Sequence, residues 1–290
     1  MEALDGLQSV APDVIKAVAP GLTRDNGAAD DYEDGDGLKV CGICHTRKQT
    51  FFEVEGLIPR TKVACMCKCE QDKQRSEEEA RKREEAKKRI EGMRERGLAD
   101  AQYRQCTFAM DDSKESKASA FCRAYASDWD WAQENNAGVM LYGDVGGGKT
   151  FLASCIANAL IDQGVYVMMT SITRLTAAMQ ENYSENRARI LREIASVPLL
   201  ILDDVGAERN TPYALEQAYE IVNARYKAKR PLIVTTNLTM SALKNAENID
   251  YKRIFDRLVE MCTPCKVDAT GRRQAEARSK HAAMLERFGL

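Results

Sequence analysis

The segment GDVGGGKT, residues 143–150, constrains the fold of this chain more than any other stretch of its sequence. It matches the pattern G-x-x-x-x-G-K-[ST], in which glycines let several backbone N–H groups point at one anion. An apolar run, residues 138–142, precedes this loop, and apolar residues recur at helical spacing after it. A strand before the loop and a helix after it predict a nucleotide phosphate site, because a helix N-terminus adds partial positive charge. We expect the nucleotide to be bound by Gly143, Asp144, Val145, Gly146, Gly147, Gly148, Lys149, Thr150 and Phe151.

Two later apolar runs end in polar side chains that fit the second half of such a site. The run LLIL is followed by Asp203 and Asp204, and LIVTT is followed by Asn237. We expect Asp203 to hold Mg²⁺ together with the hydroxyl of Thr150, while Lys149 reaches the terminal phosphates. Asp204 would orient or deprotonate the attacking water, and the amide of Asn237 would position it. Paired aspartates can also cap a strand end, and asparagine is common in turns.

The apolar runs alternate with helical patterns, which indicates a parallel sheet with both faces covered. We predict strands at 138–142, 165–169, 199–204 and 232–237 and a helix over 213–228. The fold class is therefore α/β, a P-loop parallel sheet with helices on both faces. A cysteine-rich module and a charged helix precede it. The predicted divisions are a flexible N-terminal segment 1–37, a zinc-binding module 38–70, a charged helical linker 71–103, an ATPase domain 104–275 and a C-terminal tail 276–290.

The cysteine-rich module has the spacing of a structural metal site. Cys41 and Cys44 form one C-x-x-C pair, and a second group, CMCKC, occupies residues 65–69. Two such groups supply four thiolates for a tetrahedral Zn²⁺ ion. Five cysteines compete for four places, and Cys65 and His45 are alternative ligands on spacing alone. A module this short cannot build a sufficient core, so the metal would contribute most of its folding energy.

The motifs together resemble one known family. GDVGGGKT, LLILDD, TTN and the later YKRIFDRL are similar to those of AAA+ ATPases of the DnaC/DnaI helicase-loader type, with the IstB transposition ATPases as close relatives. The resemblance covers about residues 104–275, and the cysteine-rich segment resembles the N-terminal module of Gram-positive and phage members. It implies ATP with Mg²⁺ as the nucleotide. It also implies that Cys67 and Cys69 complete the zinc site with Cys41 and Cys44.

The resemblance also assigns roles to arginines. The family's DRL box falls on residues 256–258, which implies that Arg257 is an arginine finger completing the site of a neighbouring subunit. Arg253, one helical turn earlier, is the alternative finger. Arg273, in the stretch GRR, matches the family's arginine that senses nucleotide within its own subunit.

The function implied is an ATP-dependent loader of a replicative hexameric helicase of the DnaB type onto single-stranded DNA, acting through self-association. A net charge of −2 gives no overall basic field, so DNA contacts would need a local patch. Such a patch, or only a solvated face, is formed by Arg174, Arg187, Arg189 and Arg192. The alternatives are an IstB-like transposition helper ATPase, a P-loop small-molecule kinase and a non-enzymatic zinc adaptor. With no run of about 18 apolar residues and no basic N-terminal signal, we expect a cytoplasmic protein and no membrane contact.

Overall fold

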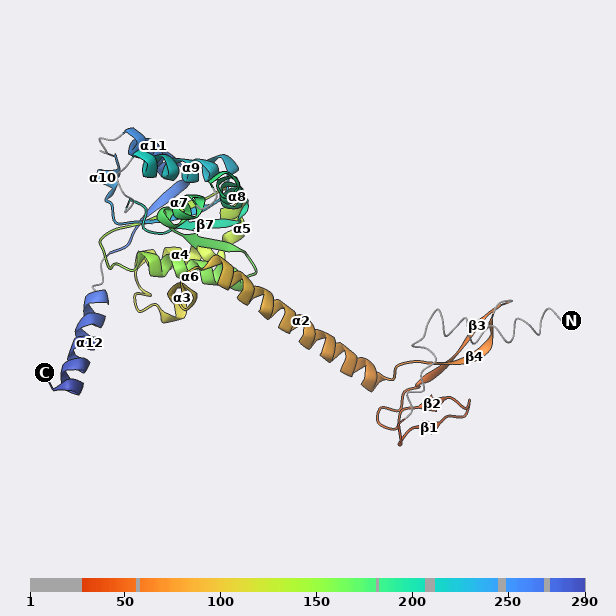
Figure 1. The fold of residues 1–290 in the computed structure, drawn as a ribbon. Helices are drawn as coiled ribbons and strands as arrows, with labels where there is room; N and C mark the ends of the chain where they lie inside the picture. The colour runs from red at the N-terminus through yellow and green to blue at the C-terminus, as the bar shows by residue number, and fades with distance from the viewer. Residues whose placement is uncertain are drawn as a thin grey trace. The chain divides into compact units, whose positions relative to one another are not determined.

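The computed structural model describes residues 28–55, 58–180, 183–206, 212–244, 249–268 and 272–289. The contacts divide the chain into two compact units, Met1–Lys87 and Lys88–Leu290. Figure 1 shows both units and labels helices and strands in each.

The first unit is built from two antiparallel strand pairs. Strand β1 (Tyr32–Glu33) pairs with β2 (Lys39–Val40), and β3 (Gln49–Val54) pairs with β4 (Ile58–Ala64). Among its described residues, the buried apolar side chains are Leu38, Val40, Cys41, Val63 and Cys67. A cluster of this size gives limited hydrophobic stabilisation, so polar and metal interactions near the cysteines can contribute much of the stability of this part.

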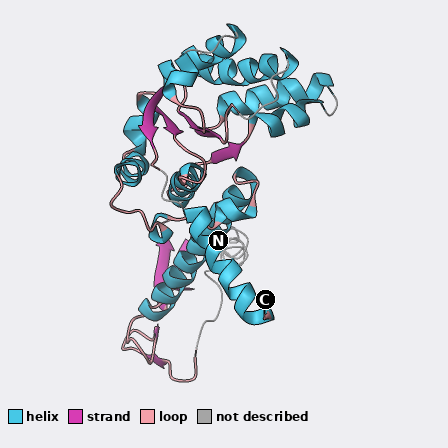
Figure 2. Ribbon diagram, turned by 90° about the vertical axis from the view of Figure 1, so that its left-hand side faces the viewer, coloured by secondary structure: helices cyan, strands magenta, loops and turns pink. Residues whose placement is uncertain are grey.

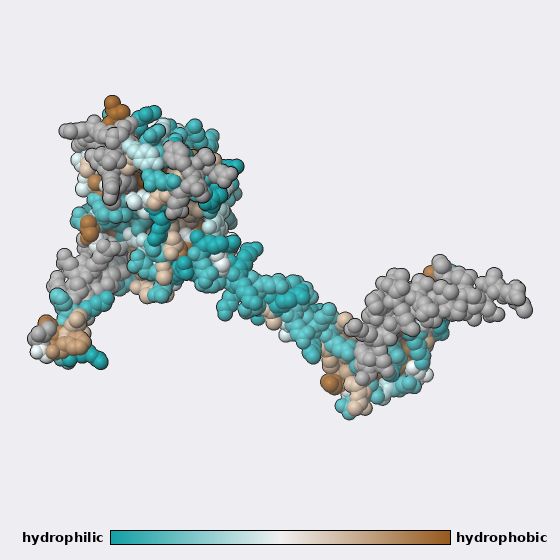
Figure 3. Space-filling model, viewed as in Figure 1, coloured by the Kyte–Doolittle hydropathy of each residue, from teal (hydrophilic) through white to brown (hydrophobic). Residues whose placement is uncertain are grey.

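Helix α2 (Lys68–Gly97) begins in the first unit and ends in the second. Its charged side chains form i,i+4 ion pairs, among them Glu78 with Lys82 at 2.7 Å. The surface of α2 that Figure 3 shows is hydrophilic along most of its length. Its last turns differ, because Met93 is buried in the core of the second unit and Arg94 donates to the side chain of Asn158 at 3.0 Å.

The second unit contains a five-stranded parallel sheet. Its strands are β5 (Gly138–Tyr142), β6 (Val167–Thr170), β7 (Leu199–Leu202), β8 (Leu232–Thr236) and β9 (Cys262–Lys266). Their order across the sheet is β6-β7-β8-β5-β9. After β5 the chain crosses to β6 at one edge, and the next two strands, β7 and β8, fill the places between, so that β8 pairs with β5. This order brings the ends of β5, β7 and β8 to the same edge, where ligands bind in open parallel sheets.

Alternate residues of each strand enter two separate cores. Leu199 and Ile201 pack in one core, while Leu200 and Leu202 pack in the other. The first core is completed by α4 (Lys117–Ser127), α5 (Trp129–Glu134) and α6 (Lys149–Asp162). The second is completed by α7 (Ile172–Gln180), α8 (Tyr183–Ser196), α9 (Pro212–Ala228) and α11 (Ile249–Met261). Figure 2 shows the strands between these helical layers. The predicted α/β class with both sheet faces covered is confirmed.

Four short or terminal elements complete the description. They are α3 (Ala101–Arg104), the 3₁₀ helix η1 (Phe108–Met110), α10 (Met240–Lys244) and α12 (Arg272–Phe288). Among the helices of the described residues, none combines the length and apolar character needed to span a bilayer.

One buried arginine ties several elements of the second unit together. Arg225, near the end of α9, is fully buried, and burial lowers its pKa to about 9. Its guanidinium donates hydrogen bonds to the main-chain carbonyls of Ile194, Val197, Pro198 and Pro231. These carbonyls belong to the end of α8 and to the residues just before β7 and β8. Arg225 therefore satisfies backbone acceptors that would otherwise be buried without a donor.

Candidate functional site

The loop between β5 and α6 has the backbone conformation that its glycines predict. Gly146 and Gly148 have φ values of 85° and 93°, which L side chains rarely adopt. A Cβ atom on Gly143 would lie 2.3 Å from the carbonyl oxygen of Val267, so only glycine fits there. Lys149 Nζ donates to the carbonyls of Gly143 at 2.9 Å and Asp144 at 2.8 Å. The lysine ammonium is thus held within the loop that would surround the phosphates.

The end of β7 brings a carboxylate against this loop. Asp203 Oδ1 accepts a hydrogen bond from the Thr150 hydroxyl at 2.8 Å. A threonine hydroxyl beside a carboxylate, next to a phosphate-binding loop, is a donor set that suits Mg²⁺. The two residues predicted to bind magnesium are therefore in direct contact.

The second aspartate faces the asparagine at the end of β8. Asp204 Oδ1 accepts a hydrogen bond from Asn237 Nδ2 at 2.7 Å. Asp204 has a φ of 58°, a left-handed conformation that is costly for a residue other than glycine. The backbone N–H of Asp204 donates to Thr235 Oγ1 at 2.8 Å, which helps to hold this conformation. The side chains predicted to act on water are thus adjacent at the sheet edge.

Thr235 is a central residue of this arrangement that the sequence analysis did not single out. Its hydroxyl donates to Asp203 Oδ1 at 2.6 Å and accepts from the N–H of Asp204. The side chain is 1% exposed. One hydroxyl therefore contacts both the side chain of Asp203 and the backbone of Asp204. The motif TTN contained this residue, but only its asparagine was assigned a role.

Tyr103 also reaches the site, from a segment predicted to be the end of the charged linker. Its hydroxyl donates to Asp203 Oδ2 at 3.1 Å. Burial, with the charge of Asp203, raises the pKa of Tyr103 to about 12, so the phenol remains a donor at neutral pH. Asn158 on α6 fixes the local backbone by donating to the carbonyls of Tyr103 at 2.7 Å and Cys106 at 2.9 Å.

These groups surround a cavity of about 620 Å³, within the range of small-molecule sites. Its lining comes from three places, the phosphate loop, the strand ends and the segment around α3 and η1. The lining residues are Gln102, Tyr103, Gln105, Cys106, Met110, Asp112, Val145, Gly146, Gly148, Lys149, Thr150, Phe151, Asp203, Asp204, Thr235 and Asn237. Lys149, Asp203, Asp204 and Asn237 thus share one cavity, as a nucleotide site requires.

The two predicted finger arginines do not line this cavity. Arg253 and Arg257 are on α11 and are absent from the described residues that line the cavity. The Arg257 guanidinium donates to the Tyr219 hydroxyl at 3.0 Å and lies 4.6 Å from the centroid of the Tyr226 ring. Arg273 falls in α12, and its side chain lies outside the described residues. Among the described residues, therefore, no arginine reaches the cavity within one copy of the chain.

The cysteine-rich module contains a second candidate site. The sulfur atoms of Cys41, Cys44, Cys67 and Cys69 all lie within 4.8 Å of one another. Zn–S bonds of about 2.3 Å in a tetrahedron place sulfur atoms about 4 Å apart, so this set fits a zinc ion. The Thr46 hydroxyl, 3.0 Å from Cys44 Sγ, lowers the pKa of that thiol to about 5, which favours the thiolate that metals bind.

The two alternative ligands point to other partners. Cys65 Sγ is 3.4 Å from the carbonyl oxygen of Arg47, to which it donates. His45 Nδ1 lies 3.2 Å from the Tyr32 hydroxyl. Neither belongs to the group of four sulfurs.

The phosphate loop lies between a strand and a helix, and a carboxylate from a neighbouring strand contacts the threonine of the loop. This arrangement defines a P-loop ATPase of the AAA+ type. The chain belongs to the family of IstB-like ATP binding proteins, whose model matches residues 73–280.

Comparison with individual proteins agrees with the predicted resemblance. The chain is 31% identical over 118 residues to the uncharacterised protein YdaV of Escherichia coli K12, covering 40% of this chain and 46% of that protein. It is 28% identical over 139 residues to the replicative helicase loader DnaC of the same organism, covering 47% of this chain and 54% of DnaC. The chain thus spans about half the length of the curated relatives it matches.

A solved structure shares the fold. The crystal structure of a primosome component from Streptococcus pyogenes serotype M3, described there as putative, matches with a TM-score of 0.50 and 22% identity, covering 61% of this chain and 95% of that one. At this identity the likeness concerns the fold alone.

Proposed function

We propose that this protein is an ATP-dependent loader that places a DnaB-type replicative helicase on single-stranded DNA. The observation that carries the ATPase part is the continuous set of contacts from Thr150 through Asp203 and Thr235 to Asp204 and Asn237. The loader part is supported by the similarity to DnaC and to the DnaI loader of Bacillus subtilis, 24% identical over 147 residues. We further propose that it acts in the cytoplasm.

In this proposal each residue of the site has one task. Lys149 and the loop N–H groups bind the phosphates of ATP, and Thr150 and Asp203 hold Mg²⁺, which neutralises charge on them. Asp204 and Asn237 orient the attacking water. Because no cation besides Lys149 lines the cavity among the described residues, hydrolysis by a lone copy should be slow.

The missing charge would come from a second copy of the chain. Arg257 is half-buried, contacts Tyr219 and Tyr226 of α9 and is not among the lining of its own cavity, as a residue presented to a neighbour would be. Arg253 is exposed on the same helix, with its guanidinium 4.8 Å from the Tyr219 ring centroid, and is the alternative finger. Self-association through a shared ATP site follows, with Arg273 sensing nucleotide from the same subunit.

The arginines proposed for DNA contact are partly engaged by carboxylates. Arg174 is paired with Asp100 at 3.0 Å, and Arg187 is paired with Glu220. Arg192 is exposed on α8, and Arg189 lies 3.4 Å from the side-chain oxygen of Asn186. Any binding of single-stranded DNA by this face would therefore depend most on Arg189 and Arg192 and would weaken with salt.

A transposition helper ATPase is the second candidate, because the matching family model is that of IstB-like proteins. The two functions differ in their partner. The test is co-purification of the full chain with a DnaB-type helicase, with and without ATP, followed by assay of helicase loading onto circular single-stranded DNA. Helicase binding and ATP-dependent loading would support the proposal. Failure of both, with stimulation of a transposase instead, would favour the alternative.

A further inference from the structure

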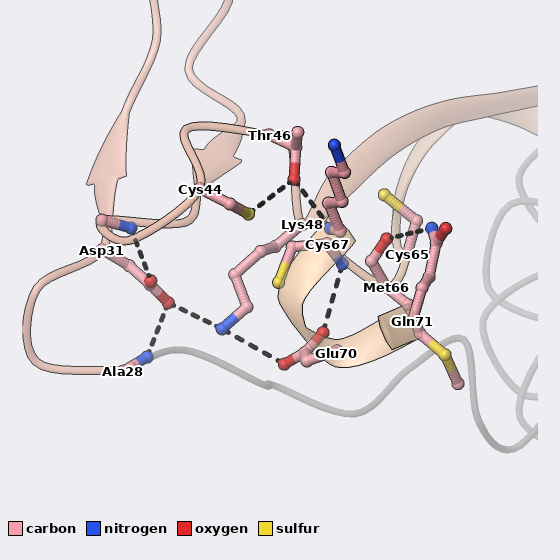
Figure 4. Close-up of polar contacts among 12 residues, drawn as sticks. Ala28, Asp31, Cys44, Thr46, Lys48, Cys65, Met66, Cys67, Glu70 and Gln71 are labelled. Carbon is pink, nitrogen blue, oxygen red and sulfur yellow. Dashed lines mark hydrogen bonds and ion pairs between the residues drawn. The ribbon is translucent and has the colours of Figure 1, made fainter. Parts of the chain in front are cut away.

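A buried lysine beside the cysteine cluster has no role in the functions proposed so far. Lys48 is 3% exposed, although lysine is rarely buried without partners. Its ammonium lies 3.0 Å from Asp31 Oδ2 and 3.4 Å from Glu70 Oε1. Burial opposes the charge, but the bonds to these two carboxylates outweigh it and raise the pKa of Lys48. The ammonium therefore stays charged between the two acids (Figure 4).

Each of these acids also binds the backbone of one cysteine pair. Asp31 Oδ1 accepts from the N–H of Gly42, which lies between Cys41 and Cys44, at 3.3 Å. Glu70 Oε2 accepts from the N–H of Cys67 at 3.2 Å. Cys67 precedes the first residue of α2, so Glu70 reaches back to the start of its own helix as in a capping box. Lys48 therefore joins the acid on the first cysteine pair to the acid on the second.

A second link runs parallel to the first. Thr46 Oγ1 lies 3.0 Å from Cys44 Sγ and accepts a hydrogen bond at 2.9 Å from the N–H of Lys68, which lies between Cys67 and Cys69. Both links join segments that are distant in sequence, and they add to the β3–β4 pairing and to the hydrogen bond from the N–H of Cys65 to the carbonyl of Lys48 at 2.8 Å.

We infer that Asp31, Lys48 and Glu70 form an outer shell of the zinc site that holds its two cysteine pairs in register for the ion. This inference rests on the proposed zinc binding by the four cysteines. Outer partners of metal ligands commonly change affinity about 10- to 100-fold when they are removed. Charge acts in the same direction. Four thiolates around Zn²⁺ carry a net charge of about −2, and the change from Lys48 to an uncharged residue removes one positive charge from beside two carboxylates near this site.

The test compares the full-length protein with Lys48→Met, which keeps the length of the side chain and removes its charge. Zinc affinity is measured by competition with a chromophoric chelator, and the ligand set is read from the visible absorption of the Co²⁺-substituted protein. Lys62→Met is the matched control, because Lys62 is an exposed lysine of the same unit that donates to the carbonyl of Gly37 at 2.7 Å.

We expect Lys48→Met to bind zinc about 10- to 100-fold more weakly with an unchanged tetrathiolate Co²⁺ spectrum, and Lys62→Met to match wild type. Equal affinities of Lys48→Met and Lys62→Met would overturn the inference while leaving the zinc site intact. A wild-type protein that holds no zinc would overturn both. If Lys48→Met binds no metal at all, the zinc affinity of Glu70→Gln is measured instead. An affinity below that of wild type supports the outer shell, and an affinity equal to that of wild type refutes it.

Discussion

Replacement of Thr235 by valine tests whether one hydroxyl positions the two aspartates that we propose to act on Mg²⁺ and water. Valine keeps the shape of the side chain but removes the donor to Asp203 Oδ1, at 2.6 Å, and the acceptor for the N–H of Asp204, at 2.8 Å. A hydrogen bond to a charged group contributes about 1.5–3 kcal/mol. At about 1.4 kcal/mol for each factor of ten, we expect kcat/KM for Mg·ATP to fall about 10- to 100-fold.

The neighbouring threonine provides a matched control for this measurement. Thr236 is as buried as Thr235, but its hydroxyl donates to the carbonyl of Val205 at 2.7 Å and accepts from the N–H of Leu238 at 3.1 Å. It contacts no carboxylate among the described residues. ATPase activity is measured over a Mg²⁺ titration, and stability by urea unfolding. Thr236→Val should lose stability with an unchanged Mg²⁺ dependence, whereas Thr235→Val should require more Mg²⁺. Indistinguishable Mg²⁺ curves for the two variants would refute the role assigned to Thr235.

Four further outcomes are expected. Lys149→Ala should abolish ATP binding, measured by calorimetry, because the loop loses the cation that reaches the phosphates. A mixture of Arg257→Ala and Asp204→Ala proteins should recover ATPase activity that neither has alone, since each supplies what the other lacks. Zinc chelation should unfold residues 38–70, seen by hydrogen exchange, while the ATPase core stays folded. Arg225→Met should lower the free energy of unfolding by at least about 3 kcal/mol, measured in urea, because several buried carbonyls lose a charged donor.

Each of these outcomes has its own control or contrary result. Lys229→Ala removes an exposed lysine far from the loop in sequence and should leave ATP affinity unchanged. Arg192→Met removes an exposed arginine of α8 and should change stability by no more than about 0.5 kcal/mol. Absence of recovery at every mixing ratio would count against a shared ATP site. If the purified protein contains no bound zinc, the prediction that chelation unfolds residues 38–70 is wrong.

Four strands of the sheet, β5, β6, β7 and β8, were predictable because they are apolar runs, whereas β9 has the mixed sequence CTPCK and was not among the strands predicted. The predicted strand 138–142 matches β5 residue for residue. The predicted strand 165–169 differs, since β6 begins at Val167. The N–H of Val165 donates to the carbonyl of Leu160 at 2.9 Å, and Gly164 has a φ of 85°, so these residues close the end of α6. In the sequence alone, an apolar residue that ends a helix, such as Val165, cannot be distinguished from the first residue of the strand that follows.

The site was only partly predictable, because some of its contacts depend on packing. The residues of the phosphate loop and the two aspartates follow a local pattern, which a sequence displays directly. Tyr103 reaches Asp203 from a segment whose backbone is held by Asn158, and no spacing rule relates those three residues. The choice between Cys65 and the other cysteines likewise depends on where β4 ends and where each thiol then points.

The position of Tyr103 has a practical consequence for anyone who expresses the ATPase core alone. A fragment that starts at residue 104, where the sequence pattern changes, would lack this phenol and also Met93 and Leu98, which are buried in the same core. Such a truncated protein should be less stable and should hold magnesium differently from the intact chain. Cutting within α2 near Lys88 keeps all three side chains.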